Sequence, residues 1–485
     1  MGDPAPAGAR PMRSFYLASK ACSSAERLTV SDKFTGEAFE EVALASPETV
    51  RDGIAAASRC REAMRRMAGH ERAAVLERLA AGVLARRDEL TDILVREAGK
   101  PRQFAAGEVD RALETIRISA RVAMDSPGGL LPLSSSPANT GYRGSQMRVP
   151  VGVCGFITPF NFPLNLVVHK VAPAIAAGCP FVLKPASSTP ISALILGELL
   201  AESGLPEGAF SVLPARGADA EALATDDRVA KLSFTGSDEV GWMLRRRAGK
   251  KRVTLELGGN AAAIVDETAD LADAARRVAF GGYYQAGQSC ISVQRVIVVD
   301  EVYAAFRALL IEEVSKVVHG DPSQEGVSVG PLISEGDAAR VEQWVRGACQ
   351  SGATKLWGGE REGSVMPATL LEGVPAGEPV LDEEVFGPVV CLVRASDFDR
   401  ALVEANRTRF GLQAGVFTRD LHRAHRAWDE LEVGAVIVGD VPSWRADVMP
   451  YGGVKDSGLG REGPASAVEE MTELRLMVIR DPDRS

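Results

Sequence analysis

The order of apolar runs between residues 150 and 257 constrains the fold more than any other feature of this sequence. VGVCGFI (151–157), PFVLK (180–184) and KLSFTG (231–236) are typical of buried strands, and a helical stretch at 193–203 lies between the last two. Parallel strands need long crossover connections, which are usually helices. The alternation therefore predicts a parallel α/β sheet.

The same alternation returns after residue 258. Strand-like runs occur at 294–300, 388–393 and 434–440, and helices are expected at 270–285 and 301–317. This pattern predicts a second α/β unit. Two other segments differ: 65–100 has a helical apolar spacing that stops at Gly99, and 126–149 is rich in turn formers, which predicts hairpin strands that leave the body of the protein.

Composition excludes several classes of function. The 485-residue chain has a net charge of −10, which opposes binding to nucleic-acid phosphates. Its seven cysteines are scattered and without C-x-x-C spacing, as expected in a reducing cytosol. We see no signal peptide, and the longest apolar stretch (171–183) is too short and too rich in proline to span a membrane. We therefore expect a cytoplasmic protein with no membrane or nucleic-acid partner and, because its five histidines lack metal-binding spacings, no metal site.

Three side chains have the chemistry of a covalent reaction. Cys290 lies in the polar turn GQSCIS, where a thiol is accessible for nucleophilic attack, although many free cysteines only fill cores. Glu256 interrupts an apolar strand, and a buried carboxylate has the raised pKa that suits a general base; a solvated edge strand is the alternative. Asn161, in TPFNFP, has an amide that is able to donate to an oxyanion, or is an ordinary turn residue.

Two segments have the character of a phosphate site. Gly236 and Ser237 follow a predicted strand and open a helix, whose free N–H groups attract anions, although a capped turn looks the same. Lys184 ends a strand, where ligand crevices of α/β sheets lie, although a surface lysine is the simpler reading. The G-x-G-x-x-G at 458–463 has no apolar strand before it, and we take it as a glycine loop.

These segments occur together in a recognisable order. The chain resembles the aldehyde dehydrogenase superfamily from about residue 28 to about 475, and is most similar to its lactaldehyde and succinate-semialdehyde branch. The motifs that carry the resemblance are TPFNFP (158–163), LKPAS (183–187), FTGS (234–237), LELGG (255–259), GQSC (287–290), EEVFGP (383–388) and MPYGGVKDSGLGREG (449–463).

The resemblance implies a Rossmann-like cofactor domain, an α/β catalytic domain and a small β oligomerisation element. Residues 1–13 would be a mobile tail, 14–125 and 148–257 the NAD(P)-binding domain, and 258–455 the catalytic domain. Residues 126–147 and 472–485 would form the element through which the family makes dimers or tetramers.

The resemblance also assigns roles. Cys290 would attack the aldehyde, Asn161 and the Cys290 N–H would stabilise the oxyanion, and hydride would pass to the nicotinamide. Glu256 would activate the water that hydrolyses the thioester, which argues for a free carboxylate product rather than an acyl-CoA.

Cofactor contacts follow in the same way. Glu384 would bind the ribose of the nicotinamide end and Phe386 would flank that ring. The other contacts would come from Lys184, Gly236, Ser237, Thr158, Pro159 and Phe160. Many NAD-preferring members have a glutamate where this chain has Ser187. Because serine does not repel a 2′-phosphate, we expect NAD or NADP as cofactor, with NADP accepted.

The substrate is expected to be a small polar or anionic aldehyde. Ser289 precedes the nucleophile, and Arg111 and Arg445 lie in segments that line the substrate funnel of related enzymes. Two arginines suit a distal carboxylate or phosphonate, although both could instead make surface salt bridges.

Two other functional classes remain open at the level of sequence. A non-catalytic binding or structural protein with this fold would not need both Cys290 and Glu256. A cofactor-independent thiol esterase would not need LKPAS, FTGS or EEVFGP.

Overall fold

The computed structural model describes residues 12–125, 128–481 and 483. Most of the tail predicted at 1–13 lies outside these residues. Met12 and Arg13 are the exception, because they form strand β1 (Met12–Arg13), which pairs in parallel with β5 (Ala38–Ala43). The predicted tail therefore extends two residues too far. β4 (Arg27–Ser31) completes this three-stranded sheet.

A first lobe is built on an eight-stranded sheet with the order β22-β12-β11-β8-β9-β10-β2-β3. The five central strands run parallel, and they are β8 (Val153–Ile157), β9 (Phe181–Lys184), β10 (Phe210–Val212), β11 (Val229–Thr235) and β12 (Arg252–Glu256). The strands at the two edges pair antiparallel, and they are β2 (Phe15–Leu17), β3 (Lys20–Cys22) and β22 (Gly458–Leu459). The predicted parallel sheet is confirmed.

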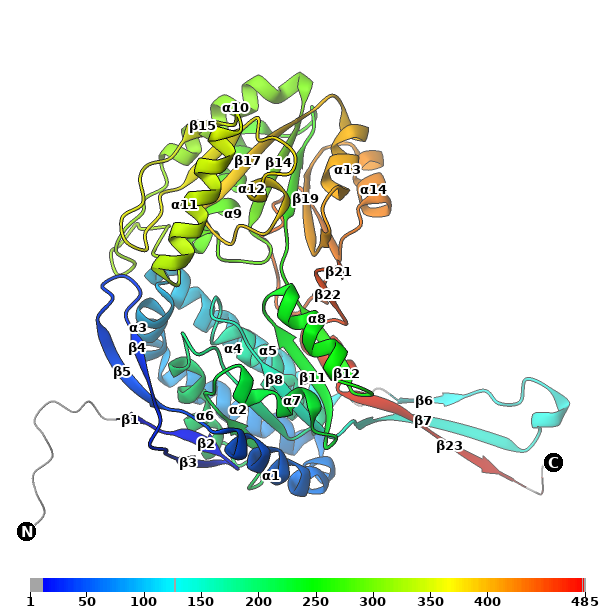
Figure 1. The fold of residues 1–485 in the computed structure, drawn as a ribbon. Helices are drawn as coiled ribbons and strands as arrows, with labels where there is room; N and C mark the ends of the chain where they lie inside the picture. Colours follow the sequence, from blue (N-terminus) through cyan, green and yellow to red (C-terminus); the bar gives the residue numbers. More distant parts are fainter. Residues whose placement is uncertain (1–11, 126–127, 482, 484–485) are drawn as a thin grey trace, which may run out of the picture.

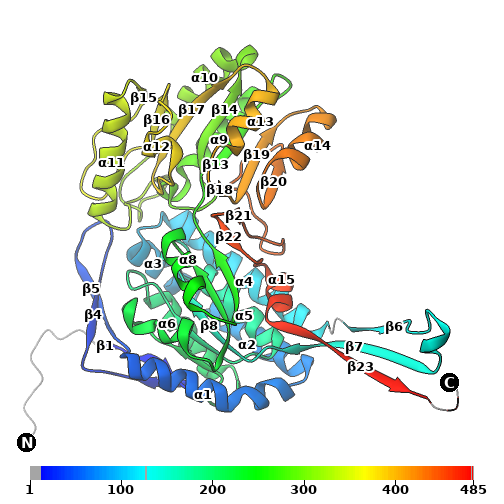
Figure 2. The ribbon, with the colours of Figure 1, turned by 45° about the vertical axis from the view of Figure 1, so that its right-hand side comes forward.

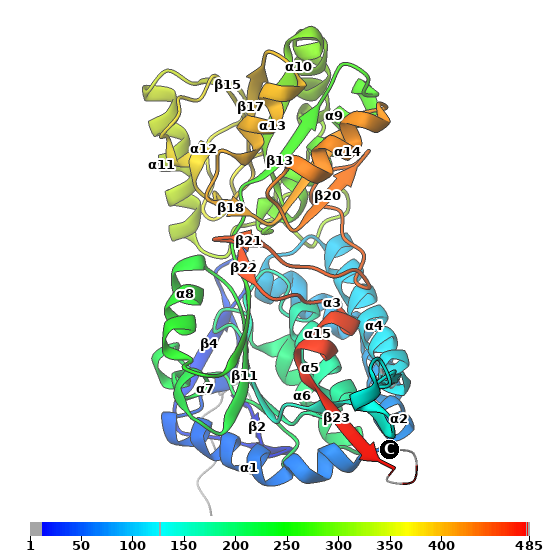
Figure 3. The same ribbon diagram turned by 90° about the vertical axis from the view of Figure 1, so that its right-hand side faces the viewer.

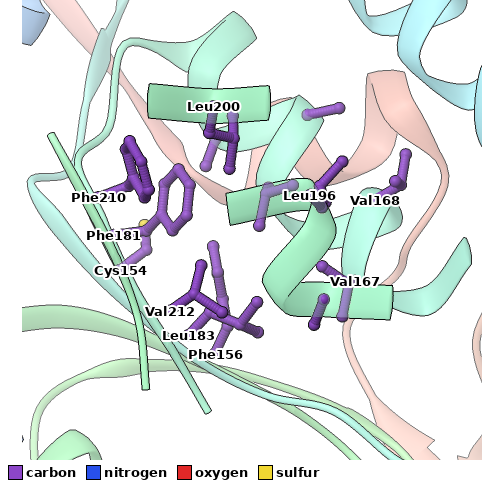
Figure 4. Close-up of a cluster of buried hydrophobic side chains, with 14 of the residues drawn as sticks. Cys154, Phe156, Val167, Val168, Phe181, Leu183, Leu196, Leu200, Phe210 and Val212 are labelled. Atoms are coloured by element: carbon purple, nitrogen blue, oxygen red, sulfur yellow. The ribbon is translucent and has the colours of Figure 1, made fainter. Parts of the chain in front are cut away.

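Helices surround this sheet. They are α1 (Pro47–Arg66), α2 (Gly69–Ala85), α3 (Arg87–Ala98), α4 (Arg102–Met124), α5 (Asn165–Ala177), α6 (Ile191–Glu202), α7 (Ala222–Thr225), α8 (Asp238–Arg247) and α15 (Pro464–Glu470). Figure 4 shows Phe156, Phe181 and Phe210 of the strands facing Leu196 and Leu200 of α6. The apolar runs that predicted the strands therefore form the core between sheet and helices.

The helix predicted at 65–100 is three helices rather than one. It covers the end of α1, then α2 and α3, which meet at Arg86. The predicted stop is confirmed, because α3 ends at Ala98 and Gly99 adopts a left-handed conformation with φ of 64°.

A second lobe is built on a seven-stranded sheet and stands above the first in Figures 1 and 2. In order, its strands are β15 (Thr354–Trp357), β16 (Thr369–Glu372), β17 (Val389–Ala395), β14 (Val293–Val299), β13 (Ala261–Val265), β19 (Gln413–Phe417) and β20 (Ala435–Val438). Its helices are α9 (Leu271–Tyr283), α10 (Asp300–Ser315), α11 (Glu335–Gln350), α12 (Pro379–Asp382), α13 (Phe398–Asn406) and α14 (Leu421–Glu430). All neighbouring strands run parallel except β15 and β16.

The chain passes between the lobes twice, and both crossings lie close together (Figure 3). The first crossing joins β12 to β13. The second follows the pairing of β18 (Phe410–Gly411) with β21 (Val454–Lys455), after which β22 joins the first sheet beside β12. Residues from the middle and from the C-terminal part of the sequence therefore meet at the boundary between the lobes.

A three-stranded sheet projects away from both lobes (Figure 1). It consists of β6 (Gly128–Leu131), β7 (Tyr142–Pro150) and β23 (Thr472–Arg480), in the order β23-β7-β6. β7 and β23 pair over nine residues each, and β23 is exposed along all but its first residue. The predicted hairpin and C-terminal strand thus form one sheet, and its role in oligomerisation remains a prediction.

Candidate active site

A cavity of about 880 Å³ lies where the carboxyl ends of the first sheet face the loops of the second lobe. Strand register places Ile157 beside Lys184 and Thr235 beside Glu256 at this edge, and all four line the cavity. The carboxyl edge of a parallel sheet is where open α/β folds bind ligands. Every site residue predicted from the sequence lines this cavity except Ser187.

The loop before Cys290 has an unusual backbone. Gln285 and Ala286 have φ values of 52° and 55°, a left-handed conformation that residues other than glycine rarely adopt. Gly259 must be glycine, because a Cβ there would lie 2.2 Å from the Cys290 carbonyl oxygen. The segment that carries Glu256 therefore packs directly against the cysteine. Strained backbone of this kind occurs often at functional sites.

Cys290 opens onto the cavity, and its Sγ lies 2.9 Å from the hydroxyl of Tyr451. Burial raises the pKa of the thiol to about 12. The nearby carboxylates of Glu384 and Glu256 act in the same direction, whereas the Tyr451 contact and the charge of Arg445 oppose them. The group is therefore a neutral thiol in this state and needs a base to become a nucleophile.

Glu256 is the last residue of β12 and is 3% exposed. Neither of its carboxylate oxygens has a hydrogen-bond partner among the described residues. Burial and then the charge of Glu462 raise the pKa of Glu256 well above its ordinary value. The alternative of a solvated edge strand is wrong, because β12 is paired on both sides. A carboxylate in this setting suits a general base.

Asn161 is fixed against the same loop. Its Nδ2 donates to the carbonyl of Gln288 at 3.0 Å, and its own carbonyl accepts from the side chain of Gln285. An amide nitrogen has two hydrogens, so one is left for an oxygen atom bound in the cavity. Asn161 is hydrogen-bonded to Gln288, which lies two residues before Cys290 in the sequence. This position suits a donor to an oxyanion.

The other end of the cavity has groups that fit a dinucleotide. Gly236 and Ser237 precede α8, and the Ser237 side chain does not cap the helix. The buried hydroxyls of Thr158 and Thr235 line the cavity and have no partner within the described chain. A helix start beside unpaired hydroxyls offers donors to a pyrophosphate.

Two ionisable groups flank this region. Burial lowers the pKa of Lys184 to about 8, and its Nζ donates to the Pro185 carbonyl at 3.1 Å. Burial raises the pKa of Glu384 to about 7, and its Oε1 accepts from the Gly259 N–H at 2.8 Å. Phe386 packs edge-on against Phe160 with ring centres 5.7 Å apart.

Ser187 lies beside the cavity rather than in its wall. Its hydroxyl donates to the Ala215 carbonyl at 3.3 Å. Gly217, two residues after Ala215 in the sequence, does line the cavity. Ser187 is therefore near enough to influence a ligand at this end, and it adds no charge.

The two predicted substrate arginines lie at the opposite end from Lys184. Arg111, on α4, makes a two-pronged ion pair with Asp447, at 2.9 Å from Nε and 2.7 Å from Nη2. Arg445 stacks on the ring of Tyr451 at 3.8 Å, and its Nε has no hydrogen-bond partner in the described structure. The salt-bridge alternative thus holds for Arg111, although the pair borders the cavity and not the outer surface.

Three residues of this site had no predicted role. Tyr451 contacts the cysteine, Asp447 holds Arg111, and Glu462 forms a buried ion pair with Lys170. Tyr451 and Glu462 lie in the quoted segment 449–463, but only the fold brings them to Cys290 and Glu256. A signal was present for Lys170 and its neighbour His169, because the two interrupt a run of apolar residues in α5.

No group of three or more histidine, cysteine or acidic side chains is arranged to hold a metal ion within 12–125 and 128–481. In the same part of the chain, none of the helices combines the length and apolarity needed to cross a membrane.

Comparison with known proteins identifies the family. Residues 20–477 match the model of the aldehyde dehydrogenase family. The 3-sulfolactaldehyde dehydrogenase of Priestia aryabhattai is 43% identical over 459 residues, which cover 94% of this chain and 96% of that protein.

Solved structures agree. Aldehyde dehydrogenase 21 from Physcomitrella patens, in complex with the reaction product succinate, has a TM-score of 0.95 at 43% identity, covering 98% of this chain and 99% of that one. The NADP-dependent glyceraldehyde-3-phosphate dehydrogenase from Bacillus halodurans C-125, complexed with NADP, has a TM-score of 0.94 at 32% identity, covering 97% and 100%. The resemblance inferred from seven short motifs is confirmed, and the chain belongs to the aldehyde dehydrogenase family.

Proposed function

We propose that this enzyme oxidises a small anionic aldehyde to the free carboxylate, with NAD or NADP as the hydride acceptor. The observation that carries the proposal is the meeting of Cys290, Asn161 and Glu256 in one cavity whose far end has unpaired donors beside a helix start. A cofactor-independent esterase would have no use for that far end, and a non-catalytic protein would have no use for the cysteine.

The first half of the reaction forms a bond between sulfur and carbon. The Cys290 thiol loses its proton to solvent water in the cavity and attacks the aldehyde carbon, and the electron pair of the carbonyl moves to oxygen. The Asn161 amide and the Cys290 N–H stabilise that oxyanion. A bound nicotinamide supplies a two-electron acceptor for the hydride that leaves the carbon, and the carbon is left as a thioester.

The second half of the reaction hydrolyses the thioester and regenerates the free thiol. Glu256 takes a proton from water, which attacks the thioester and releases the carboxylate and the Cys290 thiol. Its raised pKa suits this task because a carboxylate with a higher pKa is a stronger base. Acyl transfer to coenzyme A would not need this base, so we expect no acyl-CoA product.

The cofactor end suits NADP as well as NAD. Lys184 supplies a positive charge and Ser187 supplies no negative one, so a 2′-phosphate meets attraction without repulsion. The Bacillus halodurans relative is complexed with NADP, which supports the same proposal. We assign this end to the first lobe and the cysteine loop to the second, as the resemblance implies.

The substrate end suits a negative group. Arg111 and Arg445 both line the cavity, and the Nε of Arg445 has no hydrogen-bond partner among the described residues. The relative from Priestia aryabhattai is named for a sulfonated aldehyde, and the one from Physcomitrella patens binds succinate. Both names support an aldehyde with a distal sulfonate or carboxylate. Ser289 offers a small polar wall beside the cysteine.

We also propose that the enzyme self-associates through its projecting sheet. Leu474, Leu476 and Val478 are about half exposed and alternate along β23, so they share one face. An apolar face that points away from the body of the protein needs a partner. A second copy of the chain, as dimer or tetramer, would supply it.

The test is a panel of neutral and anionic aldehydes, each with NAD and with NADP, on the wild type and on Cys290→Ala. We expect reduced nicotinamide with anionic aldehydes only when Cys290 is present. Arg111→Ala and Arg445→Ala should raise KM for succinate semialdehyde and leave KM for propanal nearly unchanged. Ester hydrolysis without nicotinamide reduction, formation of acyl-CoA, or an unchanged KM in both arginine variants would each contradict a part of the proposal.

A further inference from the structure

Asp447 is a buried carboxylate at the substrate end, 2% exposed, with four donors directed at it. Two come from Arg111, at 2.9 and 2.7 Å. The Nδ2 of Asn165 lies 3.2 Å away and the Nε2 of His169 lies 2.8 Å away. Burial alone would raise the pKa of Asp447, but the bonds from His169 and Arg111 hold it well below its usual range. Asp447 is therefore an anion at any pH at which the enzyme works.

Arg445 is the cation that Asp447 does not neutralise. Its Nη2 lies 3.4 Å from His169 Nε2, but that nitrogen needs its hydrogen for Asp447 and has no lone pair to offer. Among the described residues Arg445 forms no ion pair, whereas the nearby carboxylates of Asp447 and Glu462 are paired with Arg111 and Lys170. Burial, and then the Arg445 charge, lower the pKa of His169, so this histidine is neutral.

Three other ion pairs lie around this end of the cavity, namely Lys170 with Glu462, Lys100 with Glu108, and Arg277 with Asp440. Within the group formed by Arg111, Arg445 and Asp447, two positive charges stand against one negative charge, so the sum for this group is a single positive charge.

Given the proposed function, on which this inference rests, we propose that Asp447 is a positioning residue that tunes the substrate end to a single negative charge. A sulfonate or carboxylate brings the sum to zero. A phosphate ester, doubly charged at pH 8 because its second pKa is about 6, leaves one uncompensated negative charge in a buried site. Uncompensated buried charge is costly, so the enzyme should discriminate against the phosphate. Asp447 also fixes the direction of the Arg111 guanidinium.

Two substrates isolate this effect. 3-Sulfolactaldehyde and glyceraldehyde 3-phosphate are both three-carbon 2-hydroxyaldehydes with the anion on the third carbon. We expect the wild type at pH 8 to have the higher kcat/KM for the sulfonate. In Asp447→Asn the sum becomes two positive charges, and the ratio of kcat/KM for phosphate over sulfonate should rise at least about tenfold. A merely structural loss would lower both values and leave their ratio unchanged.

Two control variants bracket the result. Asp447→Glu keeps the charge and should keep the wild-type ratio to within about threefold. Asp110→Asn makes the same chemical change one residue before Arg111, at an exposed carboxylate that Arg87 binds in the same two-pronged way at 2.8 Å. It should leave both rates and their ratio at wild-type values.

Each outcome decides one question. A wild type that prefers the phosphate, or a folded Asp447→Asn whose ratio does not move, overturns the inference and leaves the proposed function standing. A wild type that oxidises neither anion better than propanal overturns the proposed function instead. If Asp447→Asn does not fold, as judged by circular dichroism, Arg445→Gln takes its place, because a sum of zero must lower the phosphate-to-sulfonate ratio.

Discussion

Replacing Glu256 with glutamine should separate the two halves of the proposed reaction. The side chain is 3% exposed and its carboxylate oxygens have no hydrogen-bond partner among the described residues, so an amide of the same shape loses no bond. The folded-state pKa is raised, which means that the wild type loses stability as pH rises above the unfolded value near 4.3. Glutamine removes that loss. We therefore expect Glu256→Gln to be at least as stable as the wild type at pH 8.

The kinetic effect should fall on thioester hydrolysis alone. A positioned general base contributes about 10²- to 10⁴-fold, which corresponds to roughly 2.7–5.5 kcal/mol of activation free energy. Attack and hydride transfer depend on Cys290 and Asn161, which keep their contacts in this variant. The acyl-enzyme should accumulate because it forms at a nearly normal rate and breaks down slowly.

Stopped-flow absorbance of the reduced nicotinamide tests this directly. Glu256→Gln should give a burst of reduced nicotinamide of about one equivalent per Cys290. The steady-state rate that follows should be about 10²- to 10⁴-fold below that of the wild type. Glu239→Gln, an exposed glutamate on α8, is the matched control and should behave as wild type. Loss of the burst together with the steady state would show that Glu256 acts before hydride transfer, and an unchanged steady state would show that it is not the base.

Three further predictions follow from named contacts. Ser187→Glu should lower kcat/KM with NADP at least about tenfold and leave NAD nearly unchanged, because the new carboxylate repels a 2′-phosphate; equal losses with both cofactors would refute the role of this position. The pKa of Lys184 is lowered to about 8, so its charged form predominates below that pH. The Kd for NADP should therefore increase as pH rises through 8 in titration calorimetry, and Lys184→Met should show no such rise if the lysine is responsible. Leu476→Asp places a charge on the apolar face of β23 and should lower the mass measured by analytical ultracentrifugation, whereas an unchanged mass would place the subunit interface elsewhere.

Several candidate site residues could be located from the sequence because they lie where sequence patterns mark the end of a strand or the start of a helix. Glu256 and Lys184 end apolar strands, and Ser237 begins a helix after one. Parallel strands bring their carboxyl ends to one edge, so a correct prediction of the strands places these side chains together. Cys290 needed the family resemblance, because a polar turn alone does not show where a cysteine points.

The joints between helices could not be predicted in the same way. α2 and α3 meet at Arg86, where no proline or glycine interrupts the apolar spacing. Arg86 instead forms ion pairs with Glu89 and with Glu198 of α6, a contact across 112 residues. A tertiary contact of this kind leaves no periodic signal in the sequence.

The contacts between charged side chains at the substrate end could not be predicted from the sequence either. Arg111 was singled out from the sequence, but its partner Asp447 lies 336 residues away, and His169 lies 278 residues from the same carboxylate. Of the candidate reacting groups, Glu256 ends a strand, whereas Cys290 and Asn161 lie in loops beside strands. Under the inference above, selectivity rests instead on which buried charges are left unmatched when distant loops meet, and a substitution at Asp447 is expected to change that sum while Cys290 and Glu256 stay in place. Chemistry and substrate choice are therefore separable in this fold, and the ratio of two matched anionic substrates measures the second while the burst of Glu256→Gln measures the first.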